Sequence, residues 1–159
     1  MLIKTLTTTF ALSAALFTAT AFANPHAGHE SAADRFFTTS PDAKVFIVSP
    51  VDGDTVPSTF TVKFGAENVD IVPAGITQAN SGHHHLLIDT EELPDLTKPL
   101  PTTDQILHFG KAQTETEITL EPGTHTLQLV LGNFAHVPHK TPVISEKITV
   151  TVKANDSAE

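Results

Sequence analysis

Residues 58–66 read STFTVKFGA, and this short stretch decides the fold class. Polar residues such as Thr61 and Lys63 alternate with apolar and small ones, which fall at Phe60, Val62, Phe64 and Ala66. Successive side chains of an extended strand point to opposite faces, so a period of two predicts a strand with one buried and one exposed face. A helix would need a period of 3.6 instead.

The same alternation recurs farther along the chain. In HTLQLVLGN the leucines at 127, 129 and 131 share one face, and in ISEKITVTVK the residues Ile148, Val150 and Val152 do so. Short turn signals, Asp52-Gly53 and Pro122-Gly123, separate such stretches. Seven segments of this kind are present: KVFIVSP, STFTVKFGAENV, HHHLLIDT, QILHFGK, TETEITL, HTLQLVLGN and ISEKITVTVK. With no uninterrupted helical pattern, the chain is predicted to be an all-β, immunoglobulin-like β-sandwich of about seven strands over residues 44–153.

The segments outside this domain carry signals of their own. Residues 1–23 contain one charge, Lys4, then an apolar run that ends in Ala21-Phe22-Ala23, the pattern of a cleavable signal peptide. Residues 24–43 lack any period and are expected to be a flexible lead-in, and residues 154–159 a frayed tail. We therefore expect a periplasmic or secreted protein with no membrane insertion after signal removal.

Composition excludes several functions. Acidic residues outnumber basic ones by 18 to 9, and the net charge of −9 repels the phosphates of nucleic acids, so no nucleic-acid partner is expected. The chain has no cysteine, and its one methionine is the initiator. Thiolate and thioether metal sites and thiol catalysis are therefore ruled out for the processed chain.

The histidines are the chemical signal. The segment GHHHLLID, residues 82–89, places His83 and His85 on one face of a strand, about 7 Å apart at Cα, where both rings reach one ion. His84 points the other way, either as a histidine at the rim of the core or as a ligand from the opposite side. Because LLI is apolar on both faces, the sequence leaves open which face is buried.

Other histidines lie near predicted strand ends. His108 lies in QILHFGK, and His136 and His139 flank Pro138, which stiffens the loop before the last strand. In a sandwich such ends gather at two poles, so these residues are further candidate ligands. Imidazoles, with Asp89 or a water completing the shell, suit Cu(II) or Zn(II). His125 is expected instead to be a strand-start histidine bonded to backbone.

The chain resembles a bacterial family of unknown function, the DUF4399 domain family. The resemblance rests on GHHHLLID, HFGKAQTETEITLEPGTHTLQLVLGN and HVPHKTPVISEKITVTV, which cover most of residues 82–152. It implies an exported domain with a histidine-bearing pole. It assigns no ligand role to any histidine.

These observations favour an exported, non-enzymatic domain that holds Cu(II) or Zn(II), as a carrier or buffer, through His83 and His85, with further candidates His108, His136 and His139. One alternative is a structural or adhesive module whose histidines form a hydrogen-bond network and which binds an envelope protein or a glycan. Another is a metal-dependent hydrolase, although neither an H-E-x-x-H nor a G-x-S-x-G motif occurs.

Overall fold

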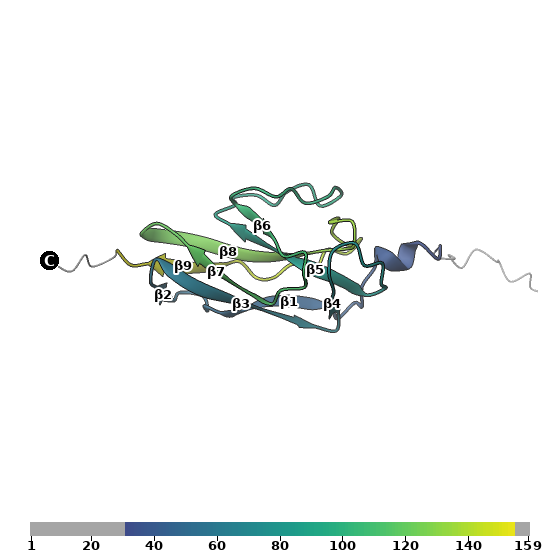
Figure 1. Cartoon of the computed structure of the whole chain (residues 1–159), viewed down its shortest axis with the longest axis horizontal. Helices are drawn as coiled ribbons and strands as arrows, with labels where there is room; N and C mark the ends of the chain where they lie inside the picture. The colour runs from purple at the N-terminus through teal and green to yellow at the C-terminus, as the bar shows by residue number, and fades with distance from the viewer. Residues whose placement is uncertain (1–30, 155–159) are drawn as a thin grey trace, which may run out of the picture.

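The protein is a two-layered β-sandwich (Figure 1). A computed structural model describes residues 31–154. The smaller sheet has the order β1-β3-β7, and all its pairings are antiparallel. Its strands are β1 (Lys44–Ser49), β3 (Thr59–Glu67) and β7 (Glu115–Thr119).

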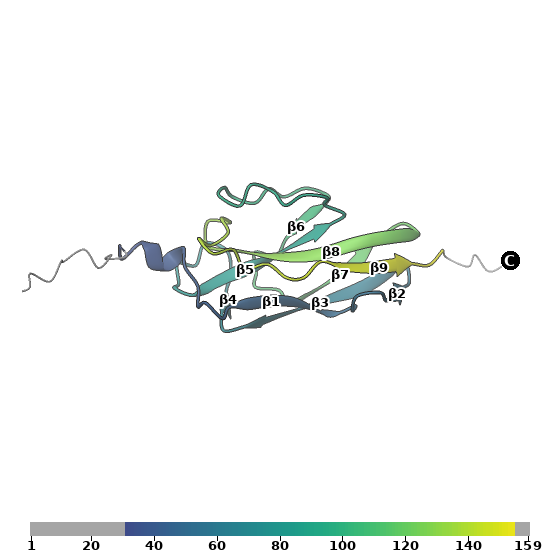
Figure 2. The same ribbon diagram turned by 180° about the vertical axis from the view of Figure 1, so that it is seen from behind.

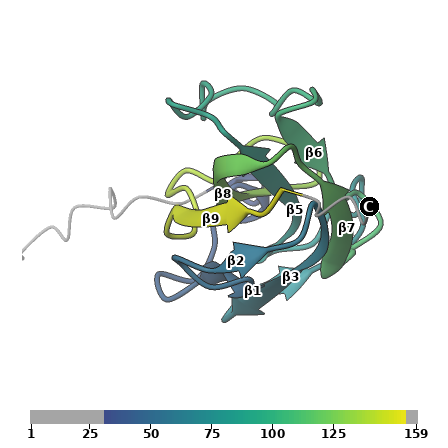
Figure 3. The ribbon, with the colours of Figure 1, turned by 90° about the vertical axis from the view of Figure 1, so that its left-hand side faces the viewer.

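The larger sheet has six strands in the order β2-β9-β8-β5-β4, with β6 paired to β5 off this path. Seen end-on, the two sheets face each other (Figure 3), and from behind β8 and β9 run along the larger one (Figure 2). Its strands are β2 (Thr55–Val56), β4 (Asp70–Ile71), β5 (Ser81–Ile88), β6 (Ile106–His108), β8 (Gly123–Gly132) and β9 (Ile148–Val152). The predicted immunoglobulin-like sandwich is confirmed. Each of the seven predicted segments overlaps one of the seven longer strands, although β5 and β8 each begin two residues earlier than predicted; β2 and β4 have two residues each.

The main core lies between the sheets, where the alternation placed it. In β3, Val62 is fully buried, whereas Thr61 and Lys63 are exposed. The three leucines of β8 and Val150 of β9 are likewise fully buried. The largest buried side chains of this core are Phe60, Phe64, Leu86, Ile88, Phe109, Ile118, Leu127, Leu129 and Leu131. The two-residue period therefore decided which side chains form the core.

Strand β5 differs from the others because all eight of its residues are buried. Leu86 and Ile88 face the main core, whereas Leu87 joins a second cluster on the outer side of the sheet with Leu100, Ile106 and Val130. Strand β6 and the segment 89–105 cover this outer side (Figures 1 and 3). The question left open by LLI is thus answered: both faces are buried.

The described part of the predicted lead-in contacts the domain. The short 3-10 helix η1 (Asp34–Phe36) precedes Phe37, whose carbonyl accepts a hydrogen bond from the Lys140 amide. Ser40 N–H donates to Asn80 Oδ1. The composition of this segment suggested a flexible lead-in, but two adjacent phenylalanines give it an apolar surface with which to dock.

Other expectations concern residues beyond this range. The predicted signal peptide, residues 1–23, lies outside the described residues, as do residues 155–159 of the predicted tail. Among residues 31–154, no helix has the length and hydropathy that a membrane span requires.

Candidate metal centre

Four of the five candidate ligands come together on the outer side of β5. His83 and His85 are two residues apart on the strand and share its outer face. His108 of β6 pairs directly with His85 across the antiparallel ladder, which brings their side chains side by side. His136 arrives from the loop after β8. The period of β5 and the register of β6 therefore build the cluster.

Two glycines leave room for the rings. A Cβ atom on Gly132, the β8 partner of His83, would lie 2.7 Å from Cε1 of His85 and 3.3 Å from Cα of His136. A Cβ atom on Gly110 would lie 2.4 Å from Cε1 of His108. Both distances to ring carbons are shorter than van der Waals contact, so any larger residue would displace an imidazole.

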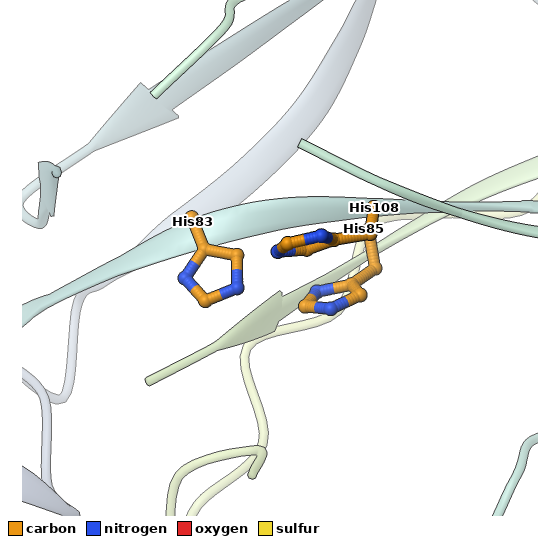
Figure 4. Close-up of side chains that lie close together, drawn as sticks. All are labelled: His83, His85 and His108. Carbon is orange, nitrogen blue, oxygen red and sulfur yellow. The ribbon is translucent and has the colours of Figure 1, made fainter. Parts of the chain in front are cut away.

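The rings are in mutual contact. The centroids of His83 and His85 are 4.9 Å apart, and that of His108 lies 5.0 Å from His83 and 5.2 Å from His85. Figure 4 shows these three side chains converging from β5 and β6. The His136 ring lies 4.7 Å from His108, 5.0 Å from His83 and 6.0 Å from His85. The four imidazoles thus form one group, which we call the histidine cluster.

Burial makes this arrangement costly for the protein alone. His83 and His85 have no exposed surface. Both ring nitrogens of each, and Nε2 of His108, are buried without a hydrogen-bond partner among the atoms of residues 31–154. An unsatisfied buried polar group costs roughly 1–3 kcal/mol, and native proteins contain few of them. So many in one place indicate that the nitrogens serve a ligand.

The surroundings keep the rings neutral. Burial lowers the pKa of His83 to about 4, with further lowering from His136, His108 and His84. Burial likewise lowers the pKa of His85 to about 3; the neighbouring imidazoles add to the effect, and an interaction with the His83 backbone, outside hydrogen-bond geometry, opposes it. Burial also lowers the pKa of His108, followed by the influence of His136. Because only a neutral imidazole has a lone pair to give a metal, these rings are ready to bind at neutral pH.

The distances fit a transition metal. One ligand atom from each of His83, His85 and His108 can be chosen so that all three lie within 4.8 Å of one another. On a tetrahedral Zn(II) with bonds of 2.0–2.1 Å, ligand nitrogens lie roughly 3.3 Å apart, so the ring nitrogens need to approach one another by up to about 1.5 Å. Rotation about χ2 supplies such movements. The all-imidazole donor set suits Cu(II) or Zn(II) and not Mg²⁺ or Ca²⁺.

The fifth candidate, His139, lies apart from these ring contacts. It is 2% exposed, and its Nε2 donates to the Ser81 carbonyl at 3.1 Å. Burial lowers its pKa, against the opposing effect of this hydrogen bond. The sequence spacing grouped His136 with His139, but the backbone turns at His136 (φ 65°). The His136 side chain therefore reaches the histidine cluster, whereas that of His139 contacts the Ser81 carbonyl.

His84 belongs to the main core. Its ring lies 5.2 Å from that of Phe64, and its Nδ1 donates to the Gln113 carbonyl at 3.3 Å. Burial lowers its pKa, partly offset by this bond. Of the two roles left open for His84, the structure therefore favours a core histidine on the face opposite the histidine cluster.

Asp89 and His125 form a separate pair. Nδ1 of His125 lies 2.7 Å from Oδ2 of Asp89, and Nε2 lies 2.8 Å from the Glu121 carbonyl. Burial lowers the His125 pKa, but these bonds outweigh it and the net pKa is raised. The expected backbone bond of His125 is present. Asp89 does not complete the metal shell as expected, because its carboxylate binds His125 and the Thr126 amide instead.

Sequence reasoning missed three supporting residues: Gly110, Gly132 and Asn133. Asn133 is 1% exposed, and its Oδ1 accepts hydrogen bonds from the amides of Ala135 and Val137, which shapes the turn at His136. A signal was available for Gly132, because a glycine that interrupts the strand pattern LVLG often marks a close approach. No comparable signal distinguished Asn133.

Fold and site together define a class: an immunoglobulin-like β-sandwich with a buried imidazole cluster on the outer face of its larger sheet. The chain belongs to the family described as "Domain of unknown function (DUF4399)", whose model matches residues 62–153. The matched region includes β5, β6 and the loop of His136, so it contains the whole cluster. No curated protein matches the sequence.

Solved structures with a similar backbone are distant. The endo-beta-1,4-mannanase from Thermotoga petrophila is 11% identical, with a TM-score of 0.44 and coverage of 72% of this chain and 20% of that one. The fibronectin(III)-like modules of Clostridium thermocellum CbhA are 12% identical, with a TM-score of 0.36 and coverage of 69% and 45%. This chain thus spans less than half of either structure.

Proposed function

We propose that this protein is an exported domain that binds one Cu(II) or Zn(II) ion through the histidine cluster and acts as a metal carrier or buffer. The single observation that carries the proposal is the set of buried, unpartnered nitrogens on His83, His85 and His108. A bound ion would give these lone pairs a partner. Export is supported by the signal-peptide pattern of residues 1–23.

A binding role fits the donor set better than a catalytic one. The group of possible ligands within reach of one ion consists of imidazoles and includes no carboxylate. A hydrolase needs an open coordination position and a general base beside it. Four converging rings would instead tend to fill the shell of the ion, as in sites that hold a metal without transforming a substrate.

Calorimetric titration of tag-free, chelator-treated protein with Zn(II) and, separately, Cu(II) tests the proposal. We expect tight one-to-one binding. Replacing both β5 ligands, in the variant His83→Ala/His85→Ala, should abolish it while the circular dichroism spectrum stays that of a β-sandwich. His125→Ala is the matched control, because it removes an imidazole from the same sheet without touching the histidine cluster.

The alternative reading, a structural or adhesive module that binds a protein or glycan, predicts a different result. The four imidazoles would then be an aromatic and polar packing unit, in which edge-on contacts such as that of His83 with His108 supply the cohesion. Only weak, multi-site binding by the wild type, with a loss of thermal stability in the double variant, would favour this reading and refute the metal site.

A further inference from the structure

His136 differs from the other members of the histidine cluster because a loop carries it. The loop 133–139 follows β8, and His136 adopts a left-handed backbone conformation (φ 65°) that costs energy for a residue with a side chain. Such a conformation persists only where the surroundings impose it. The position of the His136 ring therefore depends on whatever holds this loop.

Part of that support comes from within the loop and from two neighbouring segments. Asn133 caps the turn internally through the amides of Ala135 and Val137. The Leu100 amide donates to the His136 carbonyl at 2.9 Å, and the Gly75 amide donates to the Phe134 carbonyl at 3.0 Å. These contacts fix the loop on the side that faces the domain.

The N-terminal segment holds the outward-facing side. Phe36 and Phe37 pack edge-on against Phe134, with ring centroids 6.3 and 5.7 Å away. The Phe37 carbonyl accepts from the Lys140 amide at 2.8 Å, and Asp34 pairs with the Lys140 ammonium at 2.9 Å. In Figure 1, η1 lies at the end of the sandwich beside this loop. We call residues 34–37 the strap.

The strap is the less secure of these supports. Its two phenylalanines are half-buried, and the ion pair between Asp34 and Lys140 is largely exposed and so worth little. None of its residues belongs to a sheet, so the rest of the sandwich can remain folded when the strap detaches. A weakly docked segment of this kind can open locally at low cost.

We propose that the strap controls how fast the metal leaves: when residues 34–37 are docked, His136 is held against the ion as its fourth ligand, and when they detach, His136 withdraws and release is faster. This inference rests on the proposed metal binding at the histidine cluster. His83 and His85 are sealed from solvent, whereas His108 and His136 are partly exposed, so the ion leaves on the side where His108 and His136 lie.

The coupling must be reciprocal. If docking of the strap strengthens metal binding by some factor, metal binding strengthens docking of the strap by the same factor. A process that occupies or displaces the strap would therefore speed release of the ion without chemically changing any of the ligating histidines. Conversely, loading with metal would fix the N-terminal segment on the domain.

Zn(II) release tests the proposal. The tag-free protein is loaded with one equivalent of Zn(II) and mixed in a stopped-flow instrument with an excess of a chromogenic chelator. The variant Phe36→Ala/Phe37→Ala should release Zn(II) at least about 10-fold faster than the wild type, the usual scale for losing a support of a metal ligand. The control is Phe46→Ala, since Phe46 lies on β1 and is 38% exposed; its release rate should equal that of the wild type.

A measurement on the wild type covers the case in which the double variant does not fold. Hydrogen exchange at the Lys140 amide, which donates to the strap, should slow by a similar factor when Zn(II) is bound. The proposed role of the strap would be refuted by equal release rates in the wild type and a folded double variant. It would also be refuted if Zn(II) left the exchange rate of the Lys140 amide unchanged. Failure of the wild type to bind one equivalent would instead refute the proposed function itself.

Discussion

Replacing His85 by leucine should stabilise the metal-free protein while destroying the metal site. Both ring nitrogens of His85 are buried without a partner, and each such group costs roughly 1–3 kcal/mol. Leucine fills a similar space and needs no partner, and imperfect fit after a volume-conserving substitution usually costs less than about 1.5 kcal/mol. Two such nitrogens cost roughly 2–6 kcal/mol together, so after a packing loss of up to about 1.5 kcal/mol the variant His85→Leu should be more stable than the wild type by at least about 0.5 kcal/mol.

The assay is urea unfolding of chelator-treated protein at pH 8, where the His85 ring is neutral in both the folded and the unfolded chain. His125→Leu is the matched comparison and should have the opposite effect. The His125 ring faces two acceptors, Asp89 and the Glu121 carbonyl, and even a neutral ring donates a hydrogen bond to one of them, so its loss should destabilise the protein by about 1 kcal/mol.

The sign of the effect decides the question. If His85→Leu lowered the free energy of unfolding by more than about 1 kcal/mol, the nitrogens of His85 would have partners in solution. The histidine cluster would then be a polar network that holds the fold together. The nitrogens of His85 would then give no support to a metal site.

Two further predictions concern the same cluster. The metal-free protein should lose stability as the pH falls from 8 towards 4, because the pKa values of His83 and His85 are about 4 and 3 when folded, so the unfolded chain binds more protons in this range. At pH 5.5 the loss relative to pH 8 is about 1.4 kcal/mol per ring, measured by urea unfolding, and an unchanged midpoint would contradict the burial of the two rings. Gly132→Ala should weaken Zn(II) binding at least about 10-fold in calorimetry, since the new methyl group lies 2.7 Å from His85 Cε1. Undiminished affinity would show that the ring is not confined there. Gly53→Ala controls for the general cost of replacing a glycine outside the site, because its Cβ atom meets open space but its positive φ of 83° strains an alanine.

The pH effect has an opposing contribution from elsewhere in the sheet. The His125 pKa is raised, so its pairing with Asp89 adds stability below pH 6.5 that is lost as the pH rises through the folded pKa. His84, His108 and His139 act in the same direction as His83 and His85, since burial lowers their pKa values too. Comparing the wild type with His125→Leu separates the two contributions.

Much of the sandwich was predictable because its strands alternate. The faces of β3, β8 and β9 followed from single residues such as Val62 and Leu129, whose neighbours are polar. The buried face of β5 could not be predicted in this way, because β6 and the segment 89–105 cover its second face and bury both. A period of two carries information only where one face meets solvent.

The candidate site was predictable to the extent that it depends on local geometry. The pairing of His83 with His85 follows from strand spacing alone. The opposition of His85 and His108 depends on the register between β5 and β6, which the sequence does not state. His136 reaches the cluster and His139 does not, because of a left-handed turn shaped by Asn133.

Both faces of β5 are buried, so the main core and the histidine cluster depend on the same register of this one strand. A shift of one residue in its pairing with β8 would send His83 and His85 into the main core and bring Leu86 and Ile88 to the outer side. Such a slip would put unpaired imidazoles among the core leucines at the same moment that it emptied the cluster. Insertions and deletions within residues 81–88 should therefore be far less tolerated than substitutions, since a change of length removes core and ligands together.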